Sequence, residues 1–315
     1  MSSPVNTRRG YILGLAAYCA WGLFPLYFKS LEGIPALEVV VHRVLWSALV
    51  GALLLAIWRH PGWLRSLLDH PKRLLALTLS GALIACNWLT YVWAVHNGYM
   101  VEASLGYYIN PLVNVVLAML FLGERLRRLQ WIAVALAATG VSLQIIQLGV
   151  LPWVALVLAL SFGFYGLIRK QAPVAALPGL AIETWLLLPF ALGWLWLHPE
   201  AGSSQPQFWG NAQMLWLAAA GPITLLPLLC FNEAAKHLPY ATIAFLQYIT
   251  PPVLLEPEAA PGTATALQSL LAWVAVLTAI EPGACPALLG TRRDRPSDCN
   301  WALPVARRFQ ELRRE

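Results

Sequence analysis

Three ionisable side chains fall within one apolar stretch near the start of the chain. Glu38, His42 and Arg43 lie in a run from Ala36 to Trp58 that is otherwise mostly apolar. Glu38 and His42 are four residues apart and share a helix face, whereas Arg43 points elsewhere. A charge at the centre of a bilayer costs about 2.5 to 3.5 kcal/mol, so such residues are functional candidates. Two roles are open: proton coupling by Glu38 and His42 with substrate binding by Arg43, or a structural arginine that reaches toward the headgroups.

Amide and aromatic side chains repeat a spacing of four residues in the next two apolar segments. Two helices with such faces suit an amphiphilic organic substrate better than a bare ion, although helix packing is the alternative role for each side chain. The candidates are Asn87, Trp88 and Tyr91 in the first segment, and Tyr107, Asn110 and Asn114 in the second.

Two prolines stand at matching places in the chain. Pro111 and Pro251 cannot donate to the carbonyls of Tyr107 and Gln247, so each leaves one backbone acceptor free. In lipid a free carbonyl needs a partner, which is a neighbouring side chain or a polar cavity. The sequence therefore predicts a site around these positions, with a proline kink for packing as the alternative.

About ten apolar segments must position these residues, and most are long enough to cross roughly 30 Å of hydrocarbon. Glu183 lies about three residues inside the seventh, where it is either a gate or an interfacial acid. The pattern predicts an all-α polytopic membrane protein whose ninth span is the shortest. The segments are 11–28, 36–58, 74–95, 103–122, 131–148, 152–168, 180–197, 212–231, 240–255 and 259–280.

Positive charge is distributed asymmetrically along the chain. Of 21 Lys and Arg residues, 19 fall on one set of alternating connections, and the others are Lys29 and Arg43. Because cytoplasmic loops retain such residues, both termini are predicted to be cytoplasmic. With 59% hydrophobic and 11% charged residues, the chain has too little polar surface for a soluble globule. The net charge of +6 then faces lipid headgroups, and a nucleic-acid partner is not expected.

Several kinds of chemistry find no support in the sequence. The five cysteines lack close pairing, so neither a disulfide framework nor a metal site is predicted. No nucleotide-binding loop appears, and no cofactor is expected. An intramembrane enzyme with Glu38 and His42 as acid and base would lack any metal motif, and a passive pore is the other alternative to a carrier.

The chain contains an internal duplication. A shift of 140 residues places 108–111 (Tyr-Ile-Asn-Pro) on 248–251 (Tyr-Ile-Thr-Pro), which adds Gln247 and Tyr248 to the candidates. Because each copy has five spans, the second enters the bilayer from the opposite side, and inverted repeats around a central site permit alternating access. The predicted units are a first repeat at 1–148, a second at 149–281 and a disordered cytoplasmic tail at 282–315.

Long motifs between about residues 8 and 251 resemble a known family. They include Asn87-Trp88, 102–107 (Glu-Ala-Ser-Leu-Gly-Tyr), 109–114 (Ile-Asn-Pro-Leu-Val-Asn) and 121–125 (Phe-Leu-Gly-Glu-Arg). These stretches are similar to the EamA-like branch of the drug/metabolite transporter superfamily, and within it to the RarD group. The resemblance implies a ten-helix permease of the bacterial inner membrane with a substrate cavity between two five-helix repeats. RarD proteins are named for an association with chloramphenicol sensitivity, and related branches export amino acids and other metabolites.

The resemblance ends after Pro251. The first repeat closes its fourth helix with Gly123-Glu124, whereas the corresponding part of the second repeat contains Pro257 and Pro261 and lacks the Gly-Glu turn. Prolines shorten the ninth span. We interpret the region beyond Pro251 as altered by a change of reading frame in the gene.

Overall fold

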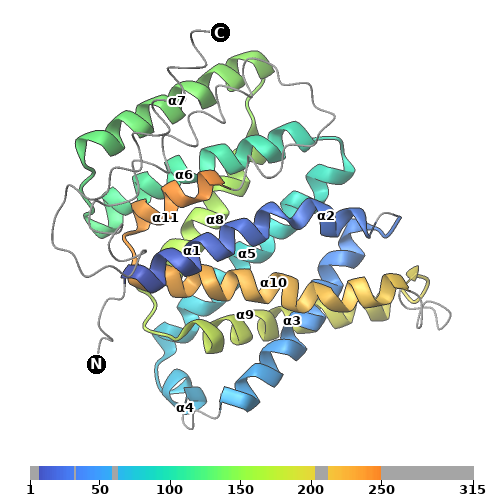
Figure 1. The fold of residues 1–315 in the computed structure, drawn as a ribbon. Coiled ribbons are helices and arrows are strands. Elements are labelled where there is room, and N and C mark those ends of the chain that lie inside the picture. Colours follow the sequence, from blue (N-terminus) through green and yellow to red (C-terminus); the bar gives the residue numbers. More distant parts are fainter. Residues whose placement is uncertain (1–6, 32, 59–62, 203–211, 250–315) are drawn as a thin grey trace.

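The computed structural model describes residues 7–31, 33–58, 63–202 and 212–249, and every regular element in these ranges is a helix (Figure 1). Eight of the described helical segments are long and apolar enough to cross a membrane, in agreement with the predicted all-α membrane protein. The ninth predicted span is described only to Ile249, and the tenth span, Pro251 and the tail lie outside the described residues. The elements are α1 (Thr7–Gly22), α2 (Phe24–Lys29), α3 (Ala36–Trp58), α4 (Trp63–Leu68), α5 (Pro71–His96), α6 (Met100–Leu122), α7 (Arg128–Leu148), α8 (Trp153–Gln171), α9 (Ala176–Leu197), α10 (Ala212–His237), α11 (Tyr240–Leu246) and the 3₁₀ turn η3 (Gln247–Ile249).

The first predicted span is divided into two helices. α1 ends at Gly22 and α2 begins at Phe24, with Pro25 in its first turn. Proline lacks the backbone N–H that a continuous helix would need at this position, and it is tolerated at a helix start. The first predicted span, 11–28, is therefore interrupted at Leu23, although Thr7–Phe28 is long and apolar enough to cross a membrane.

The seventh span begins earlier than predicted. α9 starts at Ala176, and Pro178 lies in its first turn. Proline is tolerated there because the backbone N–H groups of the first turn have no acceptor within the helix. Glu183 is the eighth residue of α9, about 10 Å along the helix axis. The prediction that Glu183 lies about three residues inside the span placed it too close to the helix end.

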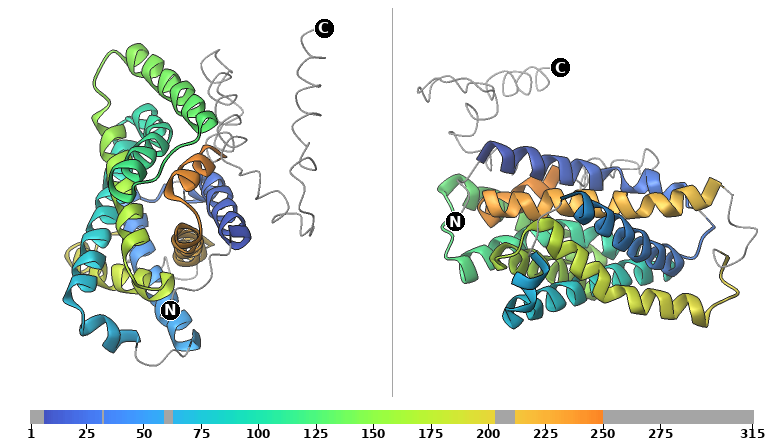
Figure 2. Two further views of the ribbon diagram at one scale, coloured as in Figure 1. Left: turned by 90° about the vertical axis from the view of Figure 1, so that its left-hand side faces the viewer. Right: turned by 90° about the horizontal axis from the view of Figure 1, so that it is seen from below.

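Five helices surround the centre of the bundle. α3 packs against α9 and α10, and α5 packs against α8 and α9. α1 runs along α10, and α6 runs along α8 and contacts α11. Figure 2 shows these long helices side by side, with α7 at the margin of the bundle, where it packs on α6. The centre is thus formed by α3, α5, α8, α9 and α10.

A glycine allows α10 to approach α3 closely. A Cβ atom on Gly221 would lie 2.6 Å from the carbonyl oxygen of Trp46, so no larger residue fits without movement. The hydroxyl of Ser47 donates a hydrogen bond of 3.3 Å to the carbonyl oxygen of Gly221. Small residues permit such close helix contacts within membranes, and this contact fixes α10 beside α3 at the centre.

Carboxylates cap helix starts on neighbouring helices. The carboxylate of Glu124 accepts hydrogen bonds from the backbone N–H groups of Tyr240, at 2.7 Å, and Ala241, at 2.9 Å. Glu102, in the first turn of α6, is the acceptor for the N–H of Val154 at 3.2 Å. Negative charge at a helix start stabilises the free N–H groups there, so these acids connect helices that are distant in sequence.

Two lysines donate hydrogen bonds to backbone carbonyl groups at or near helix ends. Lys170 donates to the carbonyl oxygens of Ala235, at 2.8 Å, and Leu238, at 2.6 Å, at the end of α10. Lys236 donates to the carbonyl oxygen of Val174, between α8 and α9. These bonds tie the ends of α8 and α10 together.

Candidate functional site

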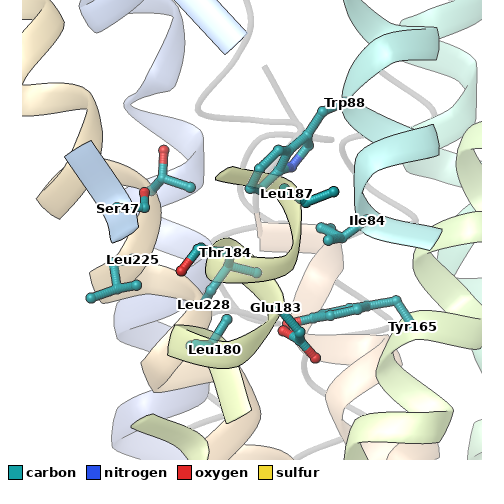
Figure 3. Close-up of a pocket in the computed structure, with 11 residues that line it drawn as sticks. Ser47, Ile84, Trp88, Tyr165, Leu180, Glu183, Thr184, Leu187, Leu225 and Leu228 are labelled. Atoms are coloured by element: carbon teal, nitrogen blue, oxygen red, sulfur yellow. The ribbon is translucent and has the colours of Figure 1, made fainter. Parts of the chain in front are cut away.

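A small cavity lies between the five central helices (Figure 3). Trp88 lies at one end of the cavity in this view, and Glu183 and Tyr165 lie together at the other end. The wall mixes hydroxyl groups with aliphatic and aromatic side chains, and the space inside, about 10 Å³, is that of about one water molecule. The lining residues are Ser47 of α3, Ile84 and Trp88 of α5, Tyr165 of α8, Leu180, Glu183, Thr184 and Leu187 of α9, and Thr224, Leu225 and Leu228 of α10.

Arg43 lies beside the Trp88 end of the cavity and is only 7% exposed. Its Nε donates a hydrogen bond of 3.0 Å to the hydroxyl of Thr224, and its guanidinium carbon is 4.6 Å from the centre of a ring of Trp88. Trp88 and Thr224 both line the cavity, so they connect it to the arginine. Among the residues that the structure describes, no carboxylate lies within ion-pair distance of Arg43.

Aromatic rings extend from Arg43 across three helices. The guanidinium carbon is 6.0 Å from the ring of Phe24 on α2. The rings of Phe28 and Tyr91 are 6.4 Å apart, and those of Tyr91 and Tyr107 are also 6.4 Å apart. We call Arg43, Thr224, Trp88, Phe24, Tyr91 and Tyr107 the Arg43 group. It unites four of the predicted site residues, Arg43, Trp88, Tyr91 and Tyr107.

A second buried arginine lies at the Glu183 end of the cavity. Nε of Arg169 is 3.4 Å from Oε1 of Glu183, and Nη2 donates to the carbonyl oxygen of Ala176 at 3.2 Å. The hydroxyl of Ser80 donates to the same Glu183 oxygen at 2.5 Å. The side chains of Arg169 and Glu183 are 0% and 2% exposed, so this ion pair is sealed from solvent.

Tyr165 and Asn232 extend this group, which we call the Arg169 cluster together with Arg169, Glu183 and Ser80. The amide of Asn232 donates a hydrogen bond of 2.9 Å to the hydroxyl of Tyr165. Within the described part of the chain, Nη1 of Arg169, Oε2 of Glu183 and Oδ1 of Asn232 are buried without hydrogen-bond partners. Buried polar groups are rarely left unsatisfied, so these three atoms carry a desolvation cost.

The structure corrects the predicted location of Arg169. Sequence counting assigned Arg169 to a cytoplasmic connection that faces the headgroups. α8 instead continues to Gln171, and the fully buried side chain of Arg169 turns into the bundle. Since Tyr165 lies four residues before it on the same helix face, this spacing was the signal that sequence reasoning missed.

The amide residues of α6 form a separate network. The amide nitrogen of Asn110 donates to the carbonyl oxygen of Ala159 at 2.8 Å, and that of Asn114 donates to Oδ1 of Asn110 at 2.9 Å. The hydroxyl of Tyr240 donates to the carbonyl oxygen of Gly163 at 2.8 Å and lies 3.1 Å from Oδ1 of Asn114. Oε1 of Gln247 accepts a weak bond of 3.5 Å from Asn114. These residues link α6, α8 and α11, and none of them lines the cavity.

Three further candidates lie at helix contacts. The amide of Asn87 donates to the carbonyl oxygen of Leu158, at 2.9 Å, and to the hydroxyl of Ser161, at 3.0 Å. Tyr248 donates a bond of 3.4 Å to the carbonyl oxygen of Tyr108, its partner in the repeat. Pro111 is buried within α6, which continues through it to Leu122.

Glu38 and His42 lie in the first two turns of α3, outside the cavity lining. Both side chains are buried. Neither ring nitrogen of His42 has a hydrogen-bond partner among the residues described. The structure thus separates this pair from the cavity.

Comparisons with known proteins agree with this architecture. Residues 8–146 match the EamA-like transporter family. An uncharacterised transporter of Pseudomonas aeruginosa is 66% identical over 80% of this chain and 85% of its own length. Protein RarD of Escherichia coli is 47% identical over 79% of this chain and 84% of its own length. One crystal structure, at 20% identity, aligns with a TM-score of 0.64 over 90% of this chain and 99% of the other, which indicates a shared fold.

These relatives define a class of membrane transporters. The chain belongs to the EamA-like transporter family and, within it, to the group of the RarD proteins.

Proposed function

We propose that this protein is a secondary carrier that exports a small organic solute by alternating access between two inverted five-helix units, 1–148 and 149–281. The observation that carries the proposal is the central cavity. Helices of both units line it, and a buried charged group lies at each end. Amino acids, other metabolites and chloramphenicol-like compounds are the solute classes to which the family resemblance points.

The pattern of helix contacts supports the inverted units. Under the repeat, α1, α3, α5 and α6 correspond to α8, α9, α10 and α11. The contact of α1 with α10 then has its counterpart in that of α8 with α5, and the contact of α3 with α10 in that of α9 with α5. The contact of α6 with α8 matches that of α11 with α1. Such exchange of partners is expected of two halves related by a pseudo-two-fold axis.

Two charged residues occupy matching positions in this scheme. Arg43 and Glu183 are 140 residues apart, and each is the eighth residue of its helix, α3 or α9. Inverted helices place such residues toward opposite faces of the membrane. With cytoplasmic termini in an inner membrane, Arg43 would lie on the outer side and Glu183 on the inner side. A solute in the cavity would then pass between a cation and an acid.

Proton coupling is part of the proposal. Glu38 and His42 are one helical turn apart at the start of α3, and the imidazole of His42 has no hydrogen-bond partner within the described residues. Histidine is the side chain whose ordinary pKa lies nearest neutral pH, which makes His42 the candidate for the group that carries the proton. Protonation there would couple solute movement to a proton gradient.

Transport by the full-length protein in proteoliposomes tests the carrier. Uptake of labelled chloramphenicol and aromatic amino acids would be measured with and without a pH gradient. Saturable uptake that the gradient drives is expected. A leak that does not saturate would indicate a pore, and release of altered product would indicate an enzyme. Glu183→Gln should lower uptake at least about tenfold, equivalent to about 1.4 kcal/mol. The exposed Glu200→Gln is the matched control.

A further inference from the structure

We propose that the Arg43 group binds the carboxylate of an aromatic organic anion. The inference rests on the proposed carrier, whose substrate class it names. Arg43 makes one hydrogen bond, and its other donors have no partner in the described structure.

Most of the guanidinium donors of Arg43 are unused. The group carries five N–H donors, and only Nε is bonded within the described structure, to Thr224. Nη1 and Nη2 have no hydrogen-bond partner there, yet they are not sealed from solvent as Nη1 of Arg169 is. A nearly buried cation with open donors is unfavourable by itself, and two parallel bonds to a carboxylate would satisfy both its charge and its geometry.

The surroundings hold the guanidinium toward the bundle interior. Thr224 on α10 fixes Nε, and Trp88 on α5 lies against the face of the group. An arginine that only anchored the protein would extend to the lipid headgroups, whereas Arg43 is 7% exposed. These contacts occupy Nε and one face of the guanidinium group, so the edge formed by Nη1 and Nη2 is left for a ligand.

The charge and the rings define the ligand further. Arg43 is the only described cation in the Arg43 group, and one cation balances a monoanion such as a carboxylate better than a phosphate dianion. Phe24, Tyr91 and Tyr107 provide ring surfaces for an apolar body. Aromatic groups favour edge-to-face or offset contacts with such rings. The fitting ligand is therefore a carboxylate attached to an aromatic ring.

Binding is tested without transport, on the purified full-length protein in detergent. Thermal unfolding, followed by tryptophan fluorescence, would be titrated with benzoate and 3-phenylpropionate. The matched probes are the corresponding neutral amides. We expect each carboxylate to raise the melting temperature and to bind about 10- to 100-fold more tightly than its amide, as a charge-assisted bond predicts.

Three variants test whether Arg43 is responsible for the preference for carboxylates. Arg43→Gln should abolish the preference for carboxylate, and Arg43→Lys should retain part of it, because lysine keeps the charge without the planar fork. Thr224→Val should weaken the preference several-fold by releasing Nε. The exposed Arg128→Gln removes one positive charge elsewhere and should leave the preference unchanged.

Two results would overturn the inference: equal binding of carboxylates and amides by the unaltered protein, or a full preference that persists in Arg43→Gln. If Arg43→Gln does not fold, Thr224→Val decides, and an undiminished preference in it is the contrary outcome. Saturable uptake of neutral solutes without carboxylate preference would refute this inference and leave the carrier intact. Carboxylate binding without any uptake would refute the carrier alone.

Discussion

The two buried arginines of the described structure have opposite surroundings. Arg169 is paired with the carboxylate of Glu183 and bonded to the carbonyl oxygen of Ala176. Arg43 contacts a hydroxyl, an indole and a phenyl ring, and no carboxylate of the described structure. Burial alone therefore does not reveal the role of a charged side chain. The set of partners distinguishes the two: Arg169 is paired with a carboxylate of α9, whereas our proposal assigns the open donors of Arg43 to a ligand.

The largest expected effect comes from breaking the Arg169 pair. Arg169→Met should lower the free energy of unfolding by about 3 to 5 kcal/mol, because it leaves the carboxylate of Glu183 buried and unpaired. Denaturant unfolding of the purified protein would measure the loss.

The double variant Arg169→Met, Glu183→Leu is the control for this prediction. It leaves no uncompensated charge and should be more stable than the single variant. A single variant as stable as the unaltered protein would show that the pair contributes nothing, and the contrast between the two arginines would then fail.

A smaller effect is expected where α9 lies against Arg169. A Cβ atom on Gly179 would meet the guanidinium group, so Gly179→Ala should cost about 1 to 3 kcal/mol by overpacking. Gly193 lies on the same helix with open space around it, and Gly193→Ala should be neutral or stabilising by up to about 1 kcal/mol. Equal melting temperatures for the two variants would mean that Arg169 is loosely held.

The smallest effect is expected at Arg43. Arg43→Met removes one hydrogen bond and a ring contact, but it also removes an unpaired buried cation, so stability should change by about 1 kcal/mol or less. Solute uptake should be lost in the same variant. A loss of stability as large as that of Arg169→Met would indicate that Arg43 has a structural partner after all.

Hydropathy predicted the described spans well, because span length and apolar composition are local properties of the chain. Hydropathy failed where a single residue alters where a helix begins or ends. Pro25 divides the first span into two helices. Pro178 lies in the first turn of α9, so this helix begins earlier than predicted and Glu183 lies farther from its start. Arg169 looked like a loop charge only because the window ended at Ile168.

The site was predictable in its charged members and less so in their partners. Arg43, Trp88 and Glu183 stood out as polar or aromatic groups inside apolar segments. Thr224 and Ser80 did not, since single hydroxyls are common within membrane helices. Their importance depends on contacts between α3 and α10 and between α5 and α9, which join residues far apart in sequence. The pairs Glu38–His42 and Asn110–Asn114 remain predictions as functional groups.

The cap formed by Glu124 has a consequence for the symmetry of the protein. This acid follows α6 and accepts hydrogen bonds from the first two backbone N–H groups of α11. The position 140 residues later in the sequence is Ala264, which has no carboxylate, and Tyr99 makes no side-chain hydrogen bond to the start of α6. Of these two helix starts, only that of α11 has such a carboxylate cap within the described structure, so we expect the amide hydrogens at the start of α6 to exchange with solvent sooner than those at the start of α11.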